Sequence, residues 1–215
     1  MLRLVRQKQA KAIEPIGARF GLRLKGLAAP VRAALETLHD ENADLRRRLA
    51  EAELLADHDS LTPTLNRRAF MRALHQAMSY AERYETPAAV LYVDLDAFKA
   101  VNDRFGHGAG DAVLRHVAQV LRAQVRESDV VGRLGGDEFG VILARSEIEE
   151  ARRKAQTLAE AIAAHPAVHE GVTHRIGASI GVHALGAVED PESALARADE
   201  AMYAAKHARA RRAER

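Results

Sequence analysis

The chain has 215 residues, of which 47% are hydrophobic and 29% charged, a balance typical of a folded soluble protein and not of a disordered one. Its 32 basic and 30 acidic side chains nearly cancel, so overall charge does not indicate a nucleic-acid partner. The absence of cysteine excludes disulfides, zinc–thiolate sites, iron–sulfur clusters and thiol nucleophiles. Because no apolar run has the length of a membrane span and no signal-peptide pattern is recognisable, we expect a cytoplasmic protein.

Residues 1–29 form a basic segment in which seven basic side chains face the single acidic residue Glu14. Two interpretations fit this composition. One is a solvated arm, and the other is a segment that binds a membrane surface or a partner, because it also carries apolar residues. The basic residues are Arg3, Arg6, Lys8, Lys11, Arg19, Arg23 and Lys25, and the apolar ones include Leu2, Leu4, Val5 and Ile13.

Residues 30–56 carry a heptad pattern. Pro30 suits the first turn of a helix, and no further proline or glycine follows until Pro63. Asn42 falls at an a position, where a buried amide fixes register and favours two parallel strands. We therefore predict a dimerising coiled coil, the alternative being one amphipathic helix packed on its own domain. The positions of the repeat are Ala28, Val31, Leu35, Leu38, Asn42, Leu45, Leu49, Ala52 and Ala56.

Residues 57–208 alternate helix-like and strand-like stretches of one globular domain. Two strands are separated only by Gly-Gly-Asp-Glu, which is hairpin spacing with permissive glycines. The order therefore predicts an α+β fold of the split βαβ kind, with an antiparallel-containing sheet and packed helices, and not a doubly wound parallel sheet. We expect helices at 66–85, 147–164 and 192–208, a short helical piece with a glycine-rich turn at 98–110, and a further helix from there to about 124. The expected strands are 88–94, 129–134, 139–144 and 173–184, and a basic tail follows at 209–215.

Acidic residues stand where two of these strands end. Asp94 closes the first buried strand, and Asp137 and Glu138 sit at the tip of the hairpin. A carboxylate at the end of an apolar strand is costly unless it binds something. If the two strands are neighbours, the acids converge and suit Mg²⁺, and two such ions around a phosphate would support in-line displacement. The alternative is a helix-capping aspartate, a role that we expect Asp96 to fill for the helix from Ala97.

Further polar residues near these acids have both a functional and a purely structural interpretation. Gly135 and Gly136 are hairpin glycines, and a turn without side chains also lets a base or phosphate approach the backbone. Lys99 is either a phosphate contact or a solvated lysine. Asn102 and Asp111 have the groups to read a guanine edge, but they also suit a turn and the first turn of a helix.

Five motifs, in order, resemble those of the GGDEF family of diguanylate cyclases, and the resemblance covers 57–208. The sequence departs from the family pattern at Pro63-Thr64, where glycine and leucine are usual, and at Ala210, where a phosphate-binding arginine is common and only the flanking Arg209 and Arg211 are present. The motifs are DSLTPTLNRR (59–68), DLDAFKAVNDRFGHGAGDAVL (94–114), GGDEF (135–139), SIGV (179–182) and ADEAMYAAK (198–206).

This resemblance implies that the protein condenses two GTP into cyclic di-GMP and two pyrophosphates. It implies two Mg²⁺ ions per active site, with Mn²⁺ as the alternative ion, bound by Asp94, the main-chain carbonyl of Leu95, and Asp137. It also implies that Asp137 activates the attacking 3′-hydroxyl, with Glu138 beside it. The remaining implied contacts are Asn102 and Asp111 with guanine, Lys99 and Lys206 with phosphate, and His107, Gly135 and Gly136 around the substrate.

The resemblance also implies an inhibitory site for the product at the R-x-x-D sequence formed by Arg126 and Asp129. Arginine grips phosphate and guanine in a bidentate manner, and aspartate accepts from guanine N–H groups. The alternative is a helix-end arginine next to a strand-leading aspartate. A second arginine usually completes such a site, and Arg152 and Arg153 are both candidates.

In the family, each active site holds one GTP, so two domains must face each other, and tethering by the coiled coil would raise their effective concentration. A change in the register of the coiled coil would then regulate whether the two active sites meet. One alternative is a receptor that binds cyclic di-GMP without making it, although the hairpin acids are intact. Another is a different nucleotidyl cyclase, although Asn102 and Asp111 argue against adenine. A purely structural coiled-coil protein would leave the acid cluster unexplained.

Overall fold

The computed structural model describes residues 28–186 and 189–213, which divide into two compact units at Ala56 and Asp57. The predicted basic arm therefore lies outside the described residues except for its last two positions, and so does part of the predicted basic tail. Within the described ranges, no helix combines the length and the apolar character that a membrane span requires.

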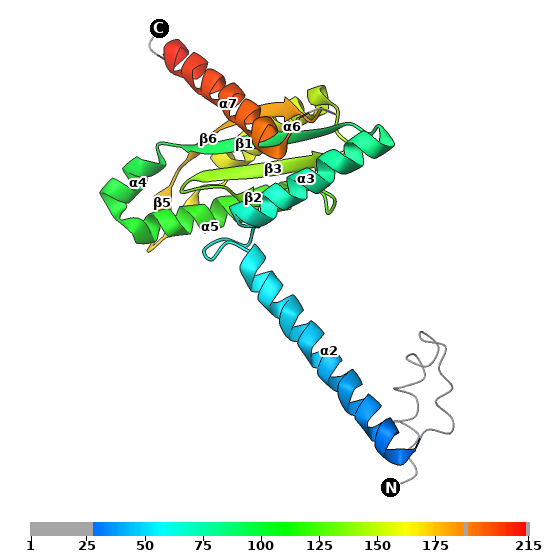
Figure 1. Cartoon of the computed structure of the whole chain (residues 1–215). Coiled ribbons are helices and arrows are strands. Elements are labelled where there is room, and N and C mark those ends of the chain that lie inside the picture. Colours follow the sequence, from blue (N-terminus) through cyan, green and yellow to red (C-terminus); the bar gives the residue numbers. More distant parts are fainter. Residues whose placement is uncertain (1–27, 187–188, 214–215) are drawn as a thin grey trace. The chain divides into compact units, whose positions relative to one another are not determined.

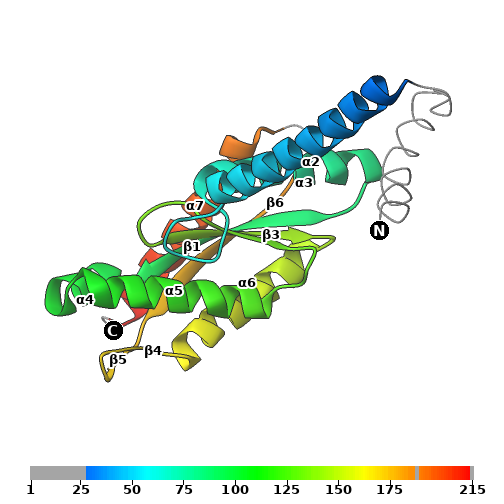
Figure 2. The same ribbon diagram turned by 90° about the horizontal axis from the view of Figure 1, so that it is seen from below.

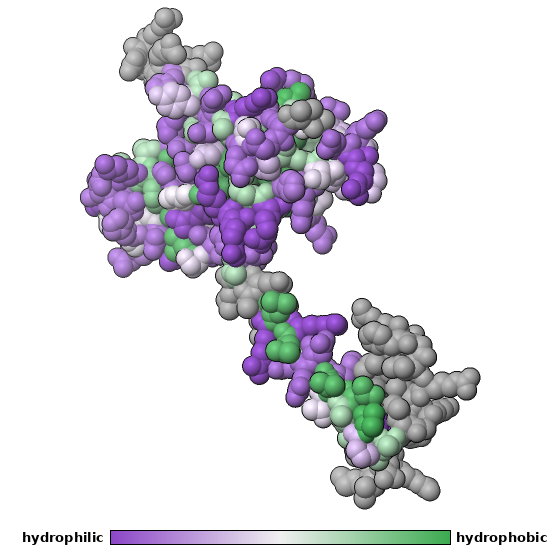
Figure 3. All heavy atoms as spheres, in the orientation of Figure 1, coloured by the Kyte–Doolittle hydropathy of each residue, from purple (hydrophilic) through white to green (hydrophobic). Residues whose placement is uncertain are grey.

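Helix α2 (Ala29–Asp57) is a single unbroken helix over the predicted heptads. Its apolar side chains are exposed, and Figure 3 shows them spaced along the visible face of the helix. Asp44 forms ion pairs with Arg47 and Arg48 away from this stripe, as expected for i, i+3 and i, i+4 neighbours. The helix is as predicted, and its pairing with a second copy stays a prediction. The exposed apolar residues are Val31, Leu38, Leu45 and Leu49.

Four strands form one sheet in which every neighbouring pair is antiparallel (Figure 1). In spatial order they are β2 (Val130–Arg133), β3 (Glu138–Ala144), β1 (Ala88–Asp96) and β6 (Gly177–Ala184). β1 is central and buried on both faces up to Val93, as its continuous apolar run predicts. The sheet and its helices confirm the α+β expectation.

Helices cover both faces of the sheet (Figure 2). α3 (Arg67–Tyr84) and α7 (Pro191–Ala213) pack on one face, and α5 (His107–Gln124) and α6 (Ile148–Ala164) pack on the other. The ring of Phe70 in α3 lies so close to the sheet that a Cβ at either Gly132 or Gly140 would lie within 2.7 Å of it. These glycines are therefore required by close packing and not by backbone conformation.

Two boundaries differ from the prediction. The short helical piece predicted at 98–110 ends earlier, because Gly106, with φ of 81°, closes α4 (Phe98–Phe105) and α5 begins at His107. The expected strand at 173–184 is divided, and its first part, β5 (Val172–His174), pairs with β4 (Ala167–His169), which the sequence analysis misses. Strands of three residues are too short to display a period-2 pattern.

The prediction that Asp96 caps the next helix is wrong. The strand continues past Asp94, and Leu95 and Asp96 pair with β6, so Asp96 still belongs to β1. Its carboxylate accepts a hydrogen bond from the Ser179 hydroxyl at 2.8 Å. Ala97 occupies the N-cap position of α4 in the left-handed conformation, with φ of 57° and without a side-chain cap.

Candidate active site

The acidic residues of β1 and β3 meet at one end of the sheet, as their positions at strand ends predict. Asp94 is directly opposite Glu138 in the antiparallel register. The main-chain N–H of Leu95 donates to the carbonyl of Asp137 at 3.3 Å, so the hairpin tip is joined to β1. We call the end of the sheet formed by Asp94, Asp137 and Glu138 the acidic end.

The turn between β2 and β3 is tight, because Leu134 N–H donates to the Glu138 carbonyl at 2.8 Å. A Cβ on Gly135 would lie 2.4 Å from the Glu138 carboxylate, whereas a Cβ on Gly136 would meet nothing within 4 Å. Gly135 is thus needed for the packing of Glu138. Gly136 instead leaves open space over the turn.

Lys206 of α7 reaches the acidic end and donates a hydrogen bond to the Asp94 carboxylate. This contact raises the pKa of Lys206, in spite of partial burial, which acts in the opposite direction. Burial and the nearby charge of Asp94 raise the pKa of Asp137, against the opposing effects of Lys206 and Arg133. The acidic end therefore concentrates more negative charge than one lysine offsets.

The donor set at the acidic end fits a magnesium ion. Over the described residues, no group of three or more histidine, aspartate or glutamate side chains is arranged to hold a metal. The groups that could hold it are those that the resemblance implies, namely the carboxylates of Asp94 and Asp137 and the main-chain carbonyl of Leu95. Hard oxygen donors that leave room for water and phosphate are those that Mg²⁺ takes. A cation there would offset both the burial of the Asp137 carboxylate and its repulsion by Asp94, the two causes that raise its pKa.

Tyr92 is a residue of this site that the sequence analysis misses. It precedes Asp94 by two positions, so the two side chains lie on the same face of β1. Tyr92 is buried, and burial together with a hydrogen bond to Glu138 raises the pKa of its hydroxyl far above the ordinary value. The signal that could have identified Tyr92 is its position two residues before Asp94 in the same strand, because such residues share one face of a sheet.

Asn102 lies on α4 and Asp111 on α5, on either side of the Gly106 break. The side-chain oxygen of Asn102 lies against Gly110, so that a Cβ there would be 2.0 Å from it. Asp111 follows in α5 and is about half exposed, with Arg115 3.9 Å away. Lys99 on α4 and His107 at the start of α5 are exposed. Asn102 thus lies against the residue that precedes Asp111, and Lys99 and His107 lie in the same pair of helices.

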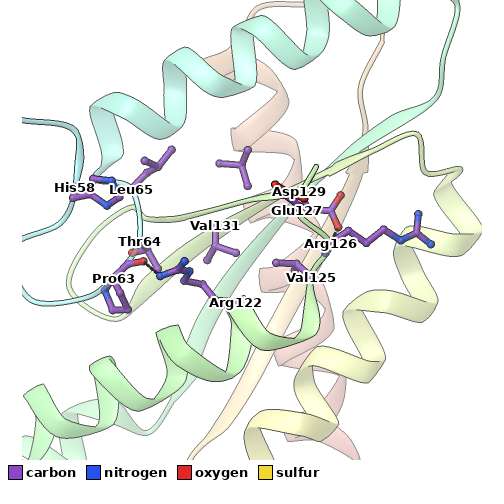
Figure 4. Close-up of a pocket in the computed structure, with 11 residues that line it drawn as sticks. His58, Pro63, Thr64, Leu65, Arg122, Val125, Arg126, Glu127, Asp129 and Val131 are labelled. Atoms are coloured by element: carbon purple, nitrogen blue, oxygen red, sulfur yellow. Dashed lines mark hydrogen bonds between the residues drawn. The ribbon is translucent and has the colours of Figure 1, made fainter. Parts of the chain in front are cut away.

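Arg126 and Asp129 lie beside the start of β2 (Figure 4). That end of β2 pairs with Ile142 and is therefore away from the acidic end. The Asp129 carboxylate accepts from the main-chain N–H groups of Arg126 at 2.9 Å and Ala144 at 3.2 Å. Both residues line a pocket of about 460 Å³ and a second one of about 230 Å³. Arg153 lines the second pocket, whereas Arg152 forms an ion pair with Glu149 at 2.6 Å.

In the larger pocket, Arg122 donates to the carbonyl of Pro63 at 3.0 Å (Figure 4). The unusual Pro63-Thr64 pair therefore forms part of its wall, together with the buried Thr64. The side chains of Arg209 and Arg211 lie outside the described residues, so the departure from the family pattern after Lys206 stays open.

Comparison with known proteins supports the resemblance. Residues 56–212 match the family model for "Diguanylate cyclase, GGDEF domain". The chain is 42% identical over 171 residues to diguanylate cyclase TpbB of Pseudomonas aeruginosa, covering 79% of this chain and 38% of TpbB. It is 38% identical over 163 residues to probable diguanylate cyclase DgcE of Escherichia coli, covering 75% of this chain and 15% of DgcE. The chain thus spans well under half the length of these two relatives.

Solved structures of GGDEF domains have the same fold as this chain. The coiled coil and GGDEF domain of DgcB from Caulobacter crescentus, in complex with c-di-GMP, matches with a TM-score of 0.75 and 29% identity, covering 83% of this chain and 95% of that one. The GGDEF domain of TpbB from P. aeruginosa matches with a TM-score of 0.66 and 42% identity, covering 70% and 88%. From the motifs, the fold and these relatives together, the chain belongs to the GGDEF family of diguanylate cyclase domains.

Proposed function

We propose that this chain is a diguanylate cyclase that condenses two GTP into cyclic di-GMP and two pyrophosphates. The observation that carries the proposal is the meeting of Asp94 at the end of β1, Asp137 in the turn before β3, and Lys206 of α7. The relatives named diguanylate cyclases at about 40% identity support the same assignment.

In the proposed reaction, the 3′-oxygen of one GTP attacks the α-phosphorus of the other. The bond from that phosphorus to the pyrophosphate breaks, and the hydroxyl proton passes to Asp137. Asp94, Asp137 and the Leu95 carbonyl would hold Mg²⁺, which when bound neutralises phosphate charge.

The remaining roles follow from where the side chains lie. Asn102 and Asp111, adjacent through Gly110, would read the guanine edge by accepting and donating hydrogen bonds. Lys206 would exchange its contact with Asp94 for a phosphate, and the exposed Lys99 would add a second positive charge. His107 would line the same substrate site, and the open space over Gly136 would admit the nucleotide backbone.

The reaction needs two copies, since each domain would bring one GTP. The exposed apolar positions of α2 repeat at seven-residue steps from Val31 to Leu38 and Leu45, which suits a two-stranded coiled coil. Burying this stripe in a homodimer would stabilise it and would hold two domains at high effective concentration.

We further propose that cyclic di-GMP inhibits the enzyme at Arg126 and Asp129. Arg153 supports this site better than Arg152, because it lines the same pocket as both residues, whereas Arg152 is paired with Glu149. Guanidinium groups on either side of a phosphate or guanine would bind the product in a bidentate manner.

The test is to strip co-purified nucleotide from the purified chain, incubate it with GTP and Mg²⁺, and separate the products by chromatography. We expect cyclic di-GMP from the wild type and none from Asp137→Ala, whereas Arg126→Ala should remain active at product concentrations that stop the wild type. A folded, stripped chain that makes no cyclic di-GMP but binds it through Arg126 would instead establish the receptor.

A further inference from the structure

Arg133, the last residue of β2, donates hydrogen bonds to the turn that contains Asp137. Its Nε donates to the carbonyls of Gly135 at 3.1 Å and Gly136 at 3.2 Å, and its Nη2 donates to the Gly136 carbonyl at 2.7 Å. Three hydrogen bonds thus connect one side chain to the two glycine carbonyls of the turn. None of the roles proposed above uses Arg133.

The same guanidinium is anchored on its other side. Its Nη1 contacts both carboxylate oxygens of Asp59, at 3.2 and 3.4 Å, although 74 residues separate the two. Both side chains are only 17% exposed. A fork of N–H groups in fixed planar geometry can bridge a carboxylate and two carbonyls, which a single ammonium group cannot do.

Asp59 is in turn held rigidly by the 58–66 loop. Its Oδ1 accepts hydrogen bonds from the main-chain N–H groups of Leu61 and Thr62 and from the buried Thr62 hydroxyl. The loop lies beside β2, because Leu65 N–H donates to Val131 at 3.1 Å and Arg133 N–H donates back to Leu65 at 2.7 Å. Asp59 is therefore a fixed support for the guanidinium.

This support matters because two consecutive glycines form the turn. Glycine loses more conformational freedom on ordering than any other residue, and Gly135 and Gly136 adjoin Asp137 directly. A cyclase depends on placing its reacting groups accurately, so an unsupported turn would lower the rate even with every acid present.

We infer that Arg133, anchored by Asp59, is a positioning residue that fixes the carbonyls of Gly135 and Gly136 and so places Asp137 for the reaction. This inference rests on the proposed cyclase function for its effect on rate, but not for its effect on the turn. It makes the 58–66 loop part of the active-site structure, although the loop contributes no group to the substrate.

The test compares Arg133→Met, which keeps length but loses every donor, with Arg133→Lys and Asp59→Asn in the full chain. Arg72→Met is the matched control, because Arg72 pairs with Asp57 at 2.5 Å just before the same loop but is not bonded to the turn. Two quantities are measured for each folded variant: steady-state GTP turnover with Mg²⁺, and amide hydrogen exchange over residues 134–138.

For Arg133→Met we expect kcat to fall about 10- to 100-fold. KM for GTP should stay within about threefold, because the lost interaction places a reacting group and does not bind substrate. Exchange should rise about tenfold or more at Gly136 and Asp137, but not in the rest of β3. Arg133→Lys and Asp59→Asn should give intermediate values, and Arg72→Met should match the wild type.

The inference is overturned if Arg133→Met exchanges like the wild type at the turn, or if exchange rises equally throughout the domain, as for plain destabilisation. A kcat within about threefold of wild type would also overturn it. If the wild type itself makes no cyclic di-GMP, the proposed function fails, and exchange at the turn still decides whether Arg133 positions it.

Discussion

The ammonium group of Lys206 lies against the carboxylate of Asp94, although 112 residues separate the two in the chain. The contact depends on how closely α7 packs on β6. At Gly181 the helix backbone is so near that a Cβ would lie 2.0 Å from the Ala198 carbonyl and 2.2 Å from Met202 N. The position of the lysine is thus set by a glycine in the strand below its helix.

Gly181→Ala should therefore move α7 and disturb the acidic end from a distance. Because backbone must shift to admit the methyl group, we expect a loss of about 1–3 kcal/mol in the free energy of unfolding. Urea denaturation measures it, with Gly186→Ala as the control, since a Cβ there meets Glu189 at an ordinary 3.5 Å. Equal stability of both variants would contradict the close packing.

Gly110→Ala should weaken GTP binding by displacing Asn102, whose side-chain oxygen lies in the path of the new methyl group. Losing one hydrogen bond of about 1.4 kcal/mol to guanine corresponds to a rise of about tenfold in KM for GTP. If the effect passes through Asn102, adding Asn102→Ala to Gly110→Ala should cost nothing further. Additive losses would show that Gly110 acts by another route.

The Asp59–Arg133 pair should make stability depend on pH. Burial alone would raise the pKa of Asp59, but hydrogen bonds from Thr62 and the Arg133 guanidinium outweigh it and lower the pKa below 3.8. The stabilising contribution is thus present above the unfolded value and is lost as the pH falls through the lower, folded one.

Asp59→Asn should accordingly be less stable than the wild type at neutral pH, and the difference should shrink as the pH is lowered from about 5 toward 2. Urea titrations at several pH values measure this difference. A gap that stays constant or widens in acid would contradict the assigned direction of the shift.

Tyr92→Phe should destabilise the domain, because it removes the hydroxyl that is hydrogen-bonded to Glu138. We expect a loss of about 1 kcal/mol in the free energy of unfolding. Tyr80→Phe is the matched control: its hydroxyl accepts from Arg145 at 3.2 Å but is exposed, so its removal should change stability by less than about 0.5 kcal/mol. If both variants lost the same free energy of unfolding, the hydrogen bond from Tyr92 to Glu138 would not be stabilising.

Self-association through α2 should be lost in the double variant Leu38→Glu and Leu45→Glu, because two charges would enter the apolar stripe. Ala43→Glu, off the stripe, should leave the molar mass unchanged. Asn42→Leu should strengthen association but loosen its register, since the buried amide no longer selects one pairing. Sedimentation equilibrium separates these outcomes, and one molar mass for all four proteins would contradict the coiled coil.

The sequence predicts the acidic end well, because strand ends and hairpin tips place residues by local pattern alone. Asp94, Asp137 and Glu138 meet as expected once β1 and β3 are neighbours. The contact between Asp59 and Arg133 could not be found in this way, because neither residue has a local pattern that distinguishes it from a surface charge.

The local sequence pattern also fails to predict where the first strand ends. The sequence predicts a strand that ends at Asp94 and a helix cap at Asp96, whereas pairing with β6 extends the strand by two residues. That extension depends on a strand more than 80 residues away, paired through Asp96 and Gly177. Tertiary pairing, and not capping preference, decides the conformation there.

The antiparallel order of the sheet has a consequence for engineering. At the end opposite the acids, Ala88 pairs with Ala144 and Ala89 pairs with Ala184. The connections to α3, α6 and α7 leave from these small residues. A reporter group, an affinity tag or a fused domain at the exposed Glu85, between α3 and β1, would have the whole length of the strands between it and the chemistry.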